Sequence, residues 1–207
     1  MRLARPHGMM PLLYWHLSRI CPASVPPTAL KTLRDHFHSN GRRNLLLMAE
    51  LLELLKLFEN NGIPAVPYKG PALAAQLYNN VSLRQFADLD ILVPRTQALQ
   101  ARNLLTSRGY QPDIQLNHWQ EAAFLDSQCQ FHQVRGDLNI AVEIHWEIVP
   151  HHMVVPIDLR QVWRRLVPTS LGGTTVLSLS PEDLLFILCV HGTKHGWQRL
   201  EWDLRHS

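Results

Sequence analysis

Two aspartates alternate with apolar residues in the segment Asp88-Leu89-Asp90-Ile91-Leu92-Val93 of this 207-residue chain. Because side chains alternate along a β-strand, both carboxylates point to one face, and Leu89 and Ile91 point to the other. The segment therefore predicts a sheet with one packed face and one polar face. Two like charges in a half-buried strand repel each other, so we expect a divalent cation to compensate them. Carboxylate oxygens suit Mg²⁺.

Two other interpretations of this acidic pair remain open. The carboxylates could face solvent, although strand positions disfavour aspartate. They could also form purely structural ion pairs, Asp88 with Arg84 or Asp90 with Lys69.

A second segment, residues 141–148, repeats the alternation. Glu143, His145 and Glu147 share one face, and apolar side chains share the other. If this strand lies beside the first one, Glu143 or His145 completes a cluster of ligands. Taken alone, the segment is equally typical of an amphipathic strand with a solvent-facing side.

A possible phosphate-binding turn lies at Lys69-Gly70, between a strand-like run at 63–68 and a helix that Pro71 opens. Glycine lets the backbone approach a ligand closely, and a helix N-terminus favours phosphate. Lys69 could neutralise that phosphate. As a single signal this turn is weak, because many such turns bind nothing.

Helical patterns flank the strand-like segments. Helices are predicted at 9–20, 29–40 and 42–60, with a break at Gly41. The polar residues of the third helix form one narrow stripe, which predicts a central helix buried on several sides. Further elements are predicted as a helix at 95–108, strands at 128–134 and 139–148 paired across the turn 135–137, a loop and helix at 154–167, a strand at 174–179, and a last helix capped by Ser180.

This order of elements predicts an α+β fold with the sheet in the middle. We expect an N-terminal helical region (1–61), an α/β core (62–179) and a C-terminal helical segment (180–207).

Composition restricts the class of partner. Twenty Lys and Arg against 17 Asp and Glu give a net charge of only +3, so long nucleic acid is not favoured as a partner, although a local contact stays open. Cys21, Cys129 and Cys189 are widely spaced, which argues against a disulfide framework and a cysteine zinc site. Charged residues interrupt the longest apolar stretch, 44–58, and no export signal is convincing. We therefore expect a soluble, cytoplasmic protein with no membrane partner.

A histidine pair lies on the last predicted helix. His191 and His195 are four residues apart and share one side of the helix. They could face a binding cleft, or they could be surface residues. A zinc pair is also conceivable, but Gly192 stands where an HExxH motif has glutamate.

Together these pieces resemble the polymerase-beta-like nucleotidyltransferase superfamily, and most closely an uncharacterised bacterial branch of it. The superfamily pattern is a glycine turn, an Asp-x-Asp strand and a third acid on a later strand. The segments that carry the resemblance are Tyr68-Lys69-Gly70-Pro71-Ala72-Leu73-Ala74, Leu77-Tyr78, Arg84, Asp88-Leu89-Asp90-Ile91-Leu92-Val93, Glu143-Ile144-His145-Trp146, and His191-Gly192-Thr193-Lys194-His195-Gly196-Trp197 with Arg199, Trp202 and Asp203.

Two departures from the pattern stand out. Pro71 replaces the Gly or Ser of the broader superfamily, which removes one contact to phosphate. The chain also ends just after Asp203, whereas members of the branch tend to carry more helix, so part of an acceptor-binding region is expected to be missing.

The resemblance implies a small mixed sheet of the nucleotidyltransferase type and a metal-dependent transfer of NMP from an NTP, with ATP the expected donor, to a hydroxyl of an unknown acceptor. In this interpretation Asp88, Asp90 and Glu143 hold one or two Mg²⁺ or Mn²⁺ ions, and Glu143 is either a ligand or a base. The residues implied to contact the nucleotide are Lys69, Gly70, Arg84, His191 and His195.

Other functions remain open at this stage. The protein could be a nucleotide-binding regulatory protein with the same fold and little or no transfer activity, which the Pro71 departure favours. A metal-dependent phosphohydrolase is a third option, although no His-Asp signature for one is recognisable. Arg84 could also form an ordinary surface salt bridge.

Overall fold

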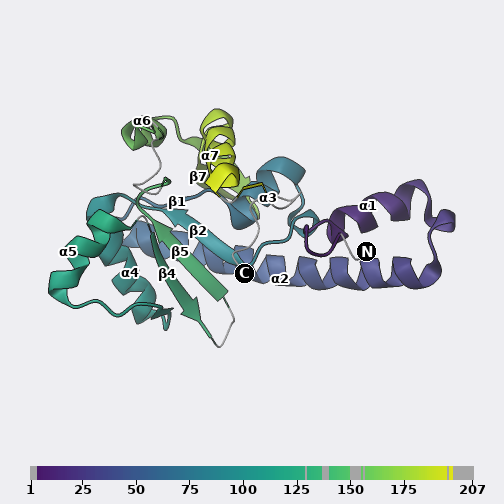
Figure 1. Cartoon of the computed structure of the whole chain (residues 1–207), viewed down its shortest axis with the longest axis horizontal. Helices are drawn as coiled ribbons and strands as arrows, with labels where there is room; N and C mark the ends of the chain where they lie inside the picture. The colour runs from purple at the N-terminus through teal and green to yellow at the C-terminus, as the bar shows by residue number, and fades with distance from the viewer. Residues whose placement is uncertain are drawn as a thin grey trace.

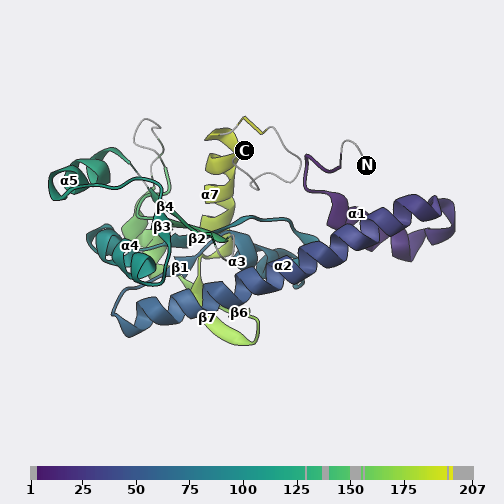
Figure 2. The ribbon, with the colours of Figure 1, turned by 90° about the horizontal axis from the view of Figure 1, so that it is seen from below.

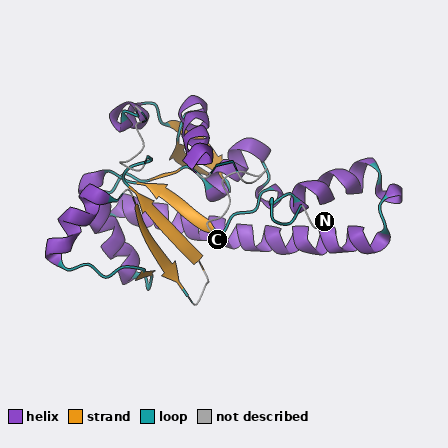
Figure 3. Ribbon diagram, in the orientation of Figure 1, coloured by secondary structure: helices purple, strands orange, loops and turns teal. Residues whose placement is uncertain are grey.

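A computed structural model describes residues 4–128, 130–136, 140–149, 155, 157–194 and 196–197. Within these ranges, helices surround a five-stranded mixed sheet, and a separate pair of strands forms a second sheet (Figures 1 and 3). The predicted α+β class is confirmed. No helix in the described ranges has both the length and the apolar character needed to cross a membrane.

The N-terminal region is a helical hairpin. Helix α1 (Met10–Ile20) packs along the first half of α2 (Pro27–Asn60), where the rings of Tyr14 and Phe37 lie 5.1 Å apart. Figure 1 shows this hairpin extending away from the sheet. A 34-residue helix is about 51 Å long, which explains how α2 reaches from the hairpin to the sheet.

The predicted break at Gly41 is wrong, because α2 continues through it. Gly41 is buried, and a Cβ atom at this position would lie 2.7 Å from Ser82 Oγ. The glycine therefore lets the 3₁₀ segment Val81–Leu83 approach the helix closely and does not end the helix.

The second half of α2 is fully buried along one face and partly buried beside it. Leu47, Leu51, Leu54 and Phe58 pack into the main core, whereas the neighbouring Leu45 and Leu46 are exposed. The expectation that this helix is buried on several sides is therefore wrong around Leu45 and Leu46.

The five-stranded sheet has the order β1-β2-β5-β4-β3. Its strands are β1 (Val66–Pro67), β2 (Asp88–Leu92), β3 (Gln111–Pro112), β4 (Gln130–Arg135) and β5 (Ile140–His145). Strands β2 and β5 are parallel, and every other neighbouring pair is antiparallel. The predicted pairing of β4 with β5 is confirmed, but Asp137 of the predicted turn lies outside the described residues.

The two faces of the sheet differ in character. Leu89, Ile91, Val142 and Ile144 point into the main core, where α2 and α4 (Ala98–Ser107) pack. Figure 2 shows α2 and α4 on one side of the sheet and α7 (Pro181–Lys194) on the other. The side that α2 and α4 leave uncovered carries the polar side chains of β2 and β5.

A second apolar cluster lies at the β1 edge. It joins α3 (Gly70–Tyr78), α6 (Leu159–Arg164) and α7 to β1 and to Leu92 of β2. The hairpin of β6 (Val167–Leu171) and β7 (Thr174–Ser178) and the helix α5 (His118–Ser127) complete the described elements. Sequence analysis predicted neither α5 nor β6.

Candidate functional site

Parallel pairing of β2 with β5 brings the two acidic segments together. Asp90 lies opposite Glu143, and Leu92 lies opposite His145, in the register of the two strands. Residues opposite each other on neighbouring strands point to the same face. The strand that carries Glu143 therefore lies beside the strand that carries the aspartates, as the predicted cluster requires.

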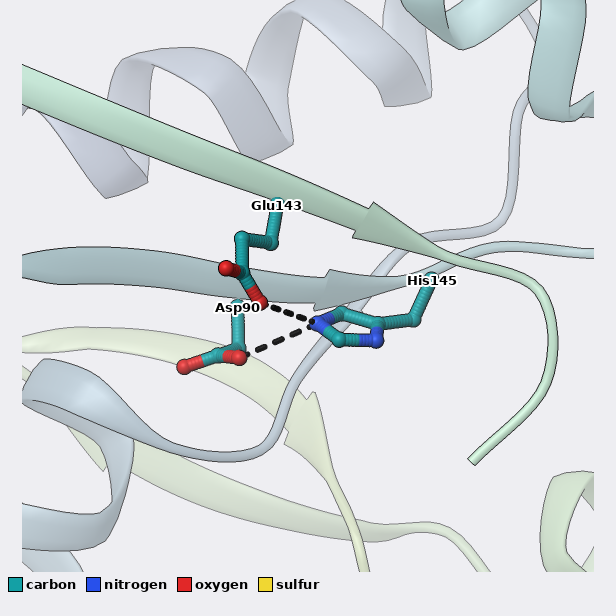
Figure 4. Close-up of side chains that lie close together, drawn as sticks. All are labelled: Asp90, Glu143 and His145. Atoms are coloured by element: carbon teal, nitrogen blue, oxygen red, sulfur yellow. Dashed lines mark hydrogen bonds and ion pairs between the residues drawn. The ribbon is translucent and has the colours of Figure 1, made fainter. Parts of the chain in front are cut away.

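Asp90, Glu143 and His145 form a compact group (Figure 4). His145 Nε2 lies 3.0 Å from Asp90 Oδ1 and 3.2 Å from Glu143 Oε2. One possible ligand atom from each residue lies within 4.8 Å of the others. Two carboxylates and an imidazole at this spacing are able to hold a divalent metal ion.

Lys69 also lies in this group. Its Nζ is 2.8 Å from Asp90 Oδ1, and both side chains are buried. The Asp90–Lys69 ion pair, which sequence analysis left open as an alternative, is therefore present in the structure. Tyr68 closes one side, with its ring edge-to-face against His145 at 5.2 Å.

Contacts within the group shift the pKa values of its members. Burial alone would lower the pKa of His145, but its contacts with Asp90 and Glu143 outweigh burial and raise that pKa above its ordinary value. Burial alone would raise the pKa of Asp90 and Glu143, but Lys69 and His145 hold the pKa of Asp90 below its usual range, and His145 does the same for Glu143. Two carboxylates thus face the Lys69 ammonium group and an imidazole whose protonated form they favour.

Asp88 lies outside the group of three. It is half-buried on the same face of β2, two residues before Asp90, and opposite Ala141. The structure therefore gathers two of the three acids expected to bind metal and adds His145, which sequence analysis offered only as an alternative to Glu143. Glu147 follows the end of β5 and is not part of the strand.

Gly70 is fixed against β2. It has a φ of +52°, and a Cβ atom there would lie 3.0 Å from the Asp88 carbonyl oxygen. Only glycine adopts this conformation readily at so close an approach. Lys69 precedes α3 as its N-cap residue, so the turn brings the N-terminus of α3 beside the acids.

Arg84 stabilises the turn at Lys69-Gly70 through a hydrogen bond. It is buried, and its Nη1 donates to the Gly70 carbonyl oxygen at 3.1 Å. Asn44 of α2 donates from Nδ2 to the carbonyl oxygens of Val81 and Arg84, at 2.6 and 2.7 Å. The segment that leads into β2 is thus fastened to α2. The predicted contact of Arg84 with phosphate stays a prediction.

The C-terminal histidines are not part of the group. His191 is half-buried on α7 and lies outside the three-residue cluster. His195, Arg199, Trp202 and Asp203 lie outside the described residues.

Asn44 was not predicted from the sequence, although its position in the helix carries a signal. Asn44 falls on the same helical stripe as Leu47 and Leu51, three and seven residues further on. A polar residue on an apolar stripe indicates a buried hydrogen-bonding role.

A comparison with protein families agrees with this geometry. A family model described as an uncharacterised nucleotidyltransferase matches residues 1–204. No curated protein and no solved structure matches the chain. Since the family model covers almost the whole sequence, including both acidic strands, the chain belongs to this family of uncharacterised nucleotidyltransferases.

Proposed function

We propose that the protein is a metal-dependent nucleotidyltransferase that moves an NMP group from an NTP, with ATP the expected donor, to a hydroxyl of an acceptor. The observation that carries this proposal is the convergence of Asp90, Glu143 and His145 from adjacent parallel strands, with their ligand atoms within 4.8 Å of one another. The family match gives the same general reaction.

The residues present fit a divalent cation, Mg²⁺ or Mn²⁺. Asp90 and Glu143 supply oxygen ligands, His145 supplies nitrogen, and Asp88 extends the acidic face by one position along β2. A bound cation would orient the triphosphate and offset the charge on its oxygens. A divalent cation held by two carboxylates and a neutral imidazole would leave the group with a net positive charge from Lys69, which suits a polyanionic nucleotide.

The turn beside the acids is suited to phosphate. Lys69 and the N-terminus of α3 supply positive charge next to Asp90, and Arg84 supports the turn at Gly70. The Lys69 ammonium group has three N–H donors, so it can contact a phosphate while it pairs with Asp90. His191 and His195 stay proposed nucleotide contacts of the C-terminal segment.

The proposed reaction is an in-line displacement. The acceptor oxygen forms a bond to the α-phosphorus, the bond from that phosphorus to the bridging oxygen breaks, and pyrophosphate leaves with the electron pair. The hydroxyl proton passes to a base. The acceptor is not identified by these residues.

The test compares wild-type protein with Asp90→Asn and Glu143→Gln. Each labelled NTP is incubated with Mg²⁺ or Mn²⁺, and pyrophosphate release and label transfer are measured. Loss of either carboxylate should reduce the rate at least about 100-fold, equivalent to about 2.7 kcal/mol of barrier. Asp35→Asn, an exposed change on the helical hairpin, is the matched control and should retain the rate. Transfer that survives Asp90→Asn contradicts the proposed site.

A regulatory nucleotide-binding protein is the second candidate. The observation that favours it is the buried ion pair between Lys69 and Asp90, which places an ammonium group on a carboxylate expected to bind metal. Metal-dependent nucleotide binding by wild-type protein without any pyrophosphate release supports this candidate over the enzyme.

A further inference from the structure

The polar face of the sheet continues beyond Glu143 onto β4. His132 lies directly opposite Glu143 in the antiparallel register of β4 and β5, so both side chains point to the same face. Asp113, which follows β3, donates its backbone N–H to the His132 carbonyl oxygen at 3.2 Å. Its carboxylate Oδ2 lies 2.5 Å from His132 Nδ1.

This contact determines how the imidazole can act. An ionised carboxylate only accepts hydrogen bonds, so Nδ1 carries the proton that His132 shares with Asp113. In the neutral ring, Nε2 is then the hydrogen-bond acceptor. Asp113 therefore fixes both the orientation of the ring and the atom available to a ligand.

His132 and Asp113 form a pair, here called the dyad. The side chains of the dyad are far more exposed than those of the candidate metal-binding group. The side chains of Asp90, Glu143 and His145 are 3%, 7% and 5% exposed, whereas those of His132 and Asp113 are 34% and 56% exposed. Exposure rises from β2 and β5 towards β4 and β3. Among these residues, a molecule from solvent would therefore reach the dyad first.

The strand order places the dyad and the Lys69-Gly70 turn on opposite sides of the acids. The Lys69-Gly70 turn follows β1, on one side of the acids, and His132 lies on β4, on the other side (Figure 1). An in-line displacement requires the attacking oxygen and the leaving pyrophosphate on opposite sides of the α-phosphorus. With the triphosphate towards α3, the attacking hydroxyl comes from the side of β4.

We propose that His132 is the residue that binds the acceptor hydroxyl and that Asp113 is its positioning residue, an assignment that rests on the proposed function. Nε2 accepts the hydrogen bond of the hydroxyl group. As the acceptor oxygen bonds to the α-phosphorus and pyrophosphate departs, the hydroxyl proton passes to Nε2. Glu143 then serves as a metal ligand, consistent with its burial beside His145.

The experiment separates nucleotide binding from transfer. Binding of the non-hydrolysable analogue α,β-methylene-ATP is measured with Mn²⁺, and transfer of AMP from ATP to glycerol or water is measured by mass spectrometry. His132→Ala should lower the transfer rate about 100-fold, the lower end for loss of a positioned base, and should leave the dissociation constant of the analogue within about twofold of the wild-type value. His118→Ala, a change at an exposed histidine on α5, is the matched control.

Three further variants keep the assignment testable if His132→Ala unfolds. His132→Gln fills a similar volume and should show the same split between binding and transfer. Asp113→Asn should lower the transfer rate and, in long-range ¹H–¹⁵N spectra, shift the His132 proton between the ring nitrogens, whereas Asp113→Glu should restore part of both.

Several outcomes overturn the assignment. If Asp90→Asn abolishes transfer and the His132 variants do not, the proposed function stands and the role of His132 is wrong. If analogue binding weakens as much as transfer, the dyad serves the nucleotide and not the acceptor. A wild-type protein that binds the analogue but forms no product contradicts both proposals.

Discussion

Lys69 supplies positive charge beside two buried carboxylates, and the His145 imidazole contacts both of them. At the level of single residues, burial would raise the pKa values of Asp90 and Glu143, and these contacts outweigh burial and hold both pKa values below their ordinary range. A buried carboxylate that loses its partner is strongly destabilising, because it has neither water nor a counter-charge.

Replacement of Lys69 by methionine should therefore destabilise the fold. Removal of one partner from a buried ion pair costs about 3 kcal/mol or more, and we expect a loss of this size in the free energy of unfolding measured with urea. Lys31→Met removes a lysine from an exposed ion pair with Asp35 and should change stability by less than about 0.5 kcal/mol. Equal stability of the two variants would show that Lys69 does not compensate Asp90.

The individual acids were predictable, but their partners were not. Period-two alternation in 88–93 and 141–148 is a local signal, and it placed Asp90 and Glu143 on the polar faces of their strands. The approach of His145 and Lys69 to Asp90 depends on the register between strands about 50 residues apart in the chain. No local pattern specifies that register, so the choice among Asp88, Glu143 and His145 as candidate ligands required the fold.

At the level of elements, α2 positions the segment that leads into β2. The Asn44 carboxamide satisfies the buried carbonyl oxygens of Val81 and Arg84, and Gly41 leaves room for Ser82. Side-chain hydrogen bonds and close packing thus connect α2 to the segment that leads into β2.

Asn44→Ala should destabilise the protein by about 1–3 kcal/mol. The change leaves the Val81 carbonyl oxygen without its Asn44 donor, and a buried unsatisfied group costs about 1–3 kcal/mol. The Arg84 carbonyl oxygen keeps a second hydrogen bond, from Asn40 Nδ2 at 3.0 Å. Asn103→Ala, at an exposed position on α4, is the control and should have little effect. Chemical denaturation of both variants measures the difference, and a loss at Asn44 no larger than at Asn103 would contradict this role.

The start of α7 should give the fold a dependence on acid. Ser180 Oγ accepts the backbone N–H of Asp183, and the Asp183 carboxylate receives two hydrogen bonds from Arg165, at 2.6 and 3.0 Å. The Arg165 guanidinium, assisted by the Ser180 hydroxyl, holds the pKa of Asp183 below its ordinary value. Such a group stabilises the fold above the pKa of the unfolded chain, about 3.9, and loses this effect as pH falls through the lower folded value.

Asp183→Asn should therefore lower the urea midpoint similarly at pH 7 and pH 5, and the gap to wild type should narrow below about pH 4. Glu182→Gln, on the same helical turn, is the comparison and should give a much smaller gap. A gap for Asp183→Asn that widens in acid would mean that the carboxylate does not stabilise this helix.

Helices and strands with strong local sequence signals were predicted, and those with weak local signals were not. The cap at Ser180 and the strand pair 128–134 with 139–148 were predictable because capping residues and alternation are local. Helix α5 was missed even though Asn117 and Gln120 form a capping box, since its body has no clear apolar face. The break predicted at Gly41 failed because tertiary contact, and not helix propensity, selects glycine there.

At the scale of the whole molecule, the order of helices and strands was enough to predict the α+β class. The strand order β1-β2-β5-β4-β3 was not predictable, because the sequence of a strand does not indicate which non-consecutive strand pairs with it in parallel. That pair creates the candidate site, so the chemistry could be expected from the sequence while its geometry could not.

The continuity of α2 has a consequence for how this chain can be shortened. The same unbroken helix forms part of the N-terminal hairpin and holds the carbonyl groups just before Asp88. A fragment that begins after residue 61 would keep every acid of the polar face and lose the support behind Gly70 and Arg84. Helix α2 is thus a structural requirement of the acidic strand and not a detachable appendage.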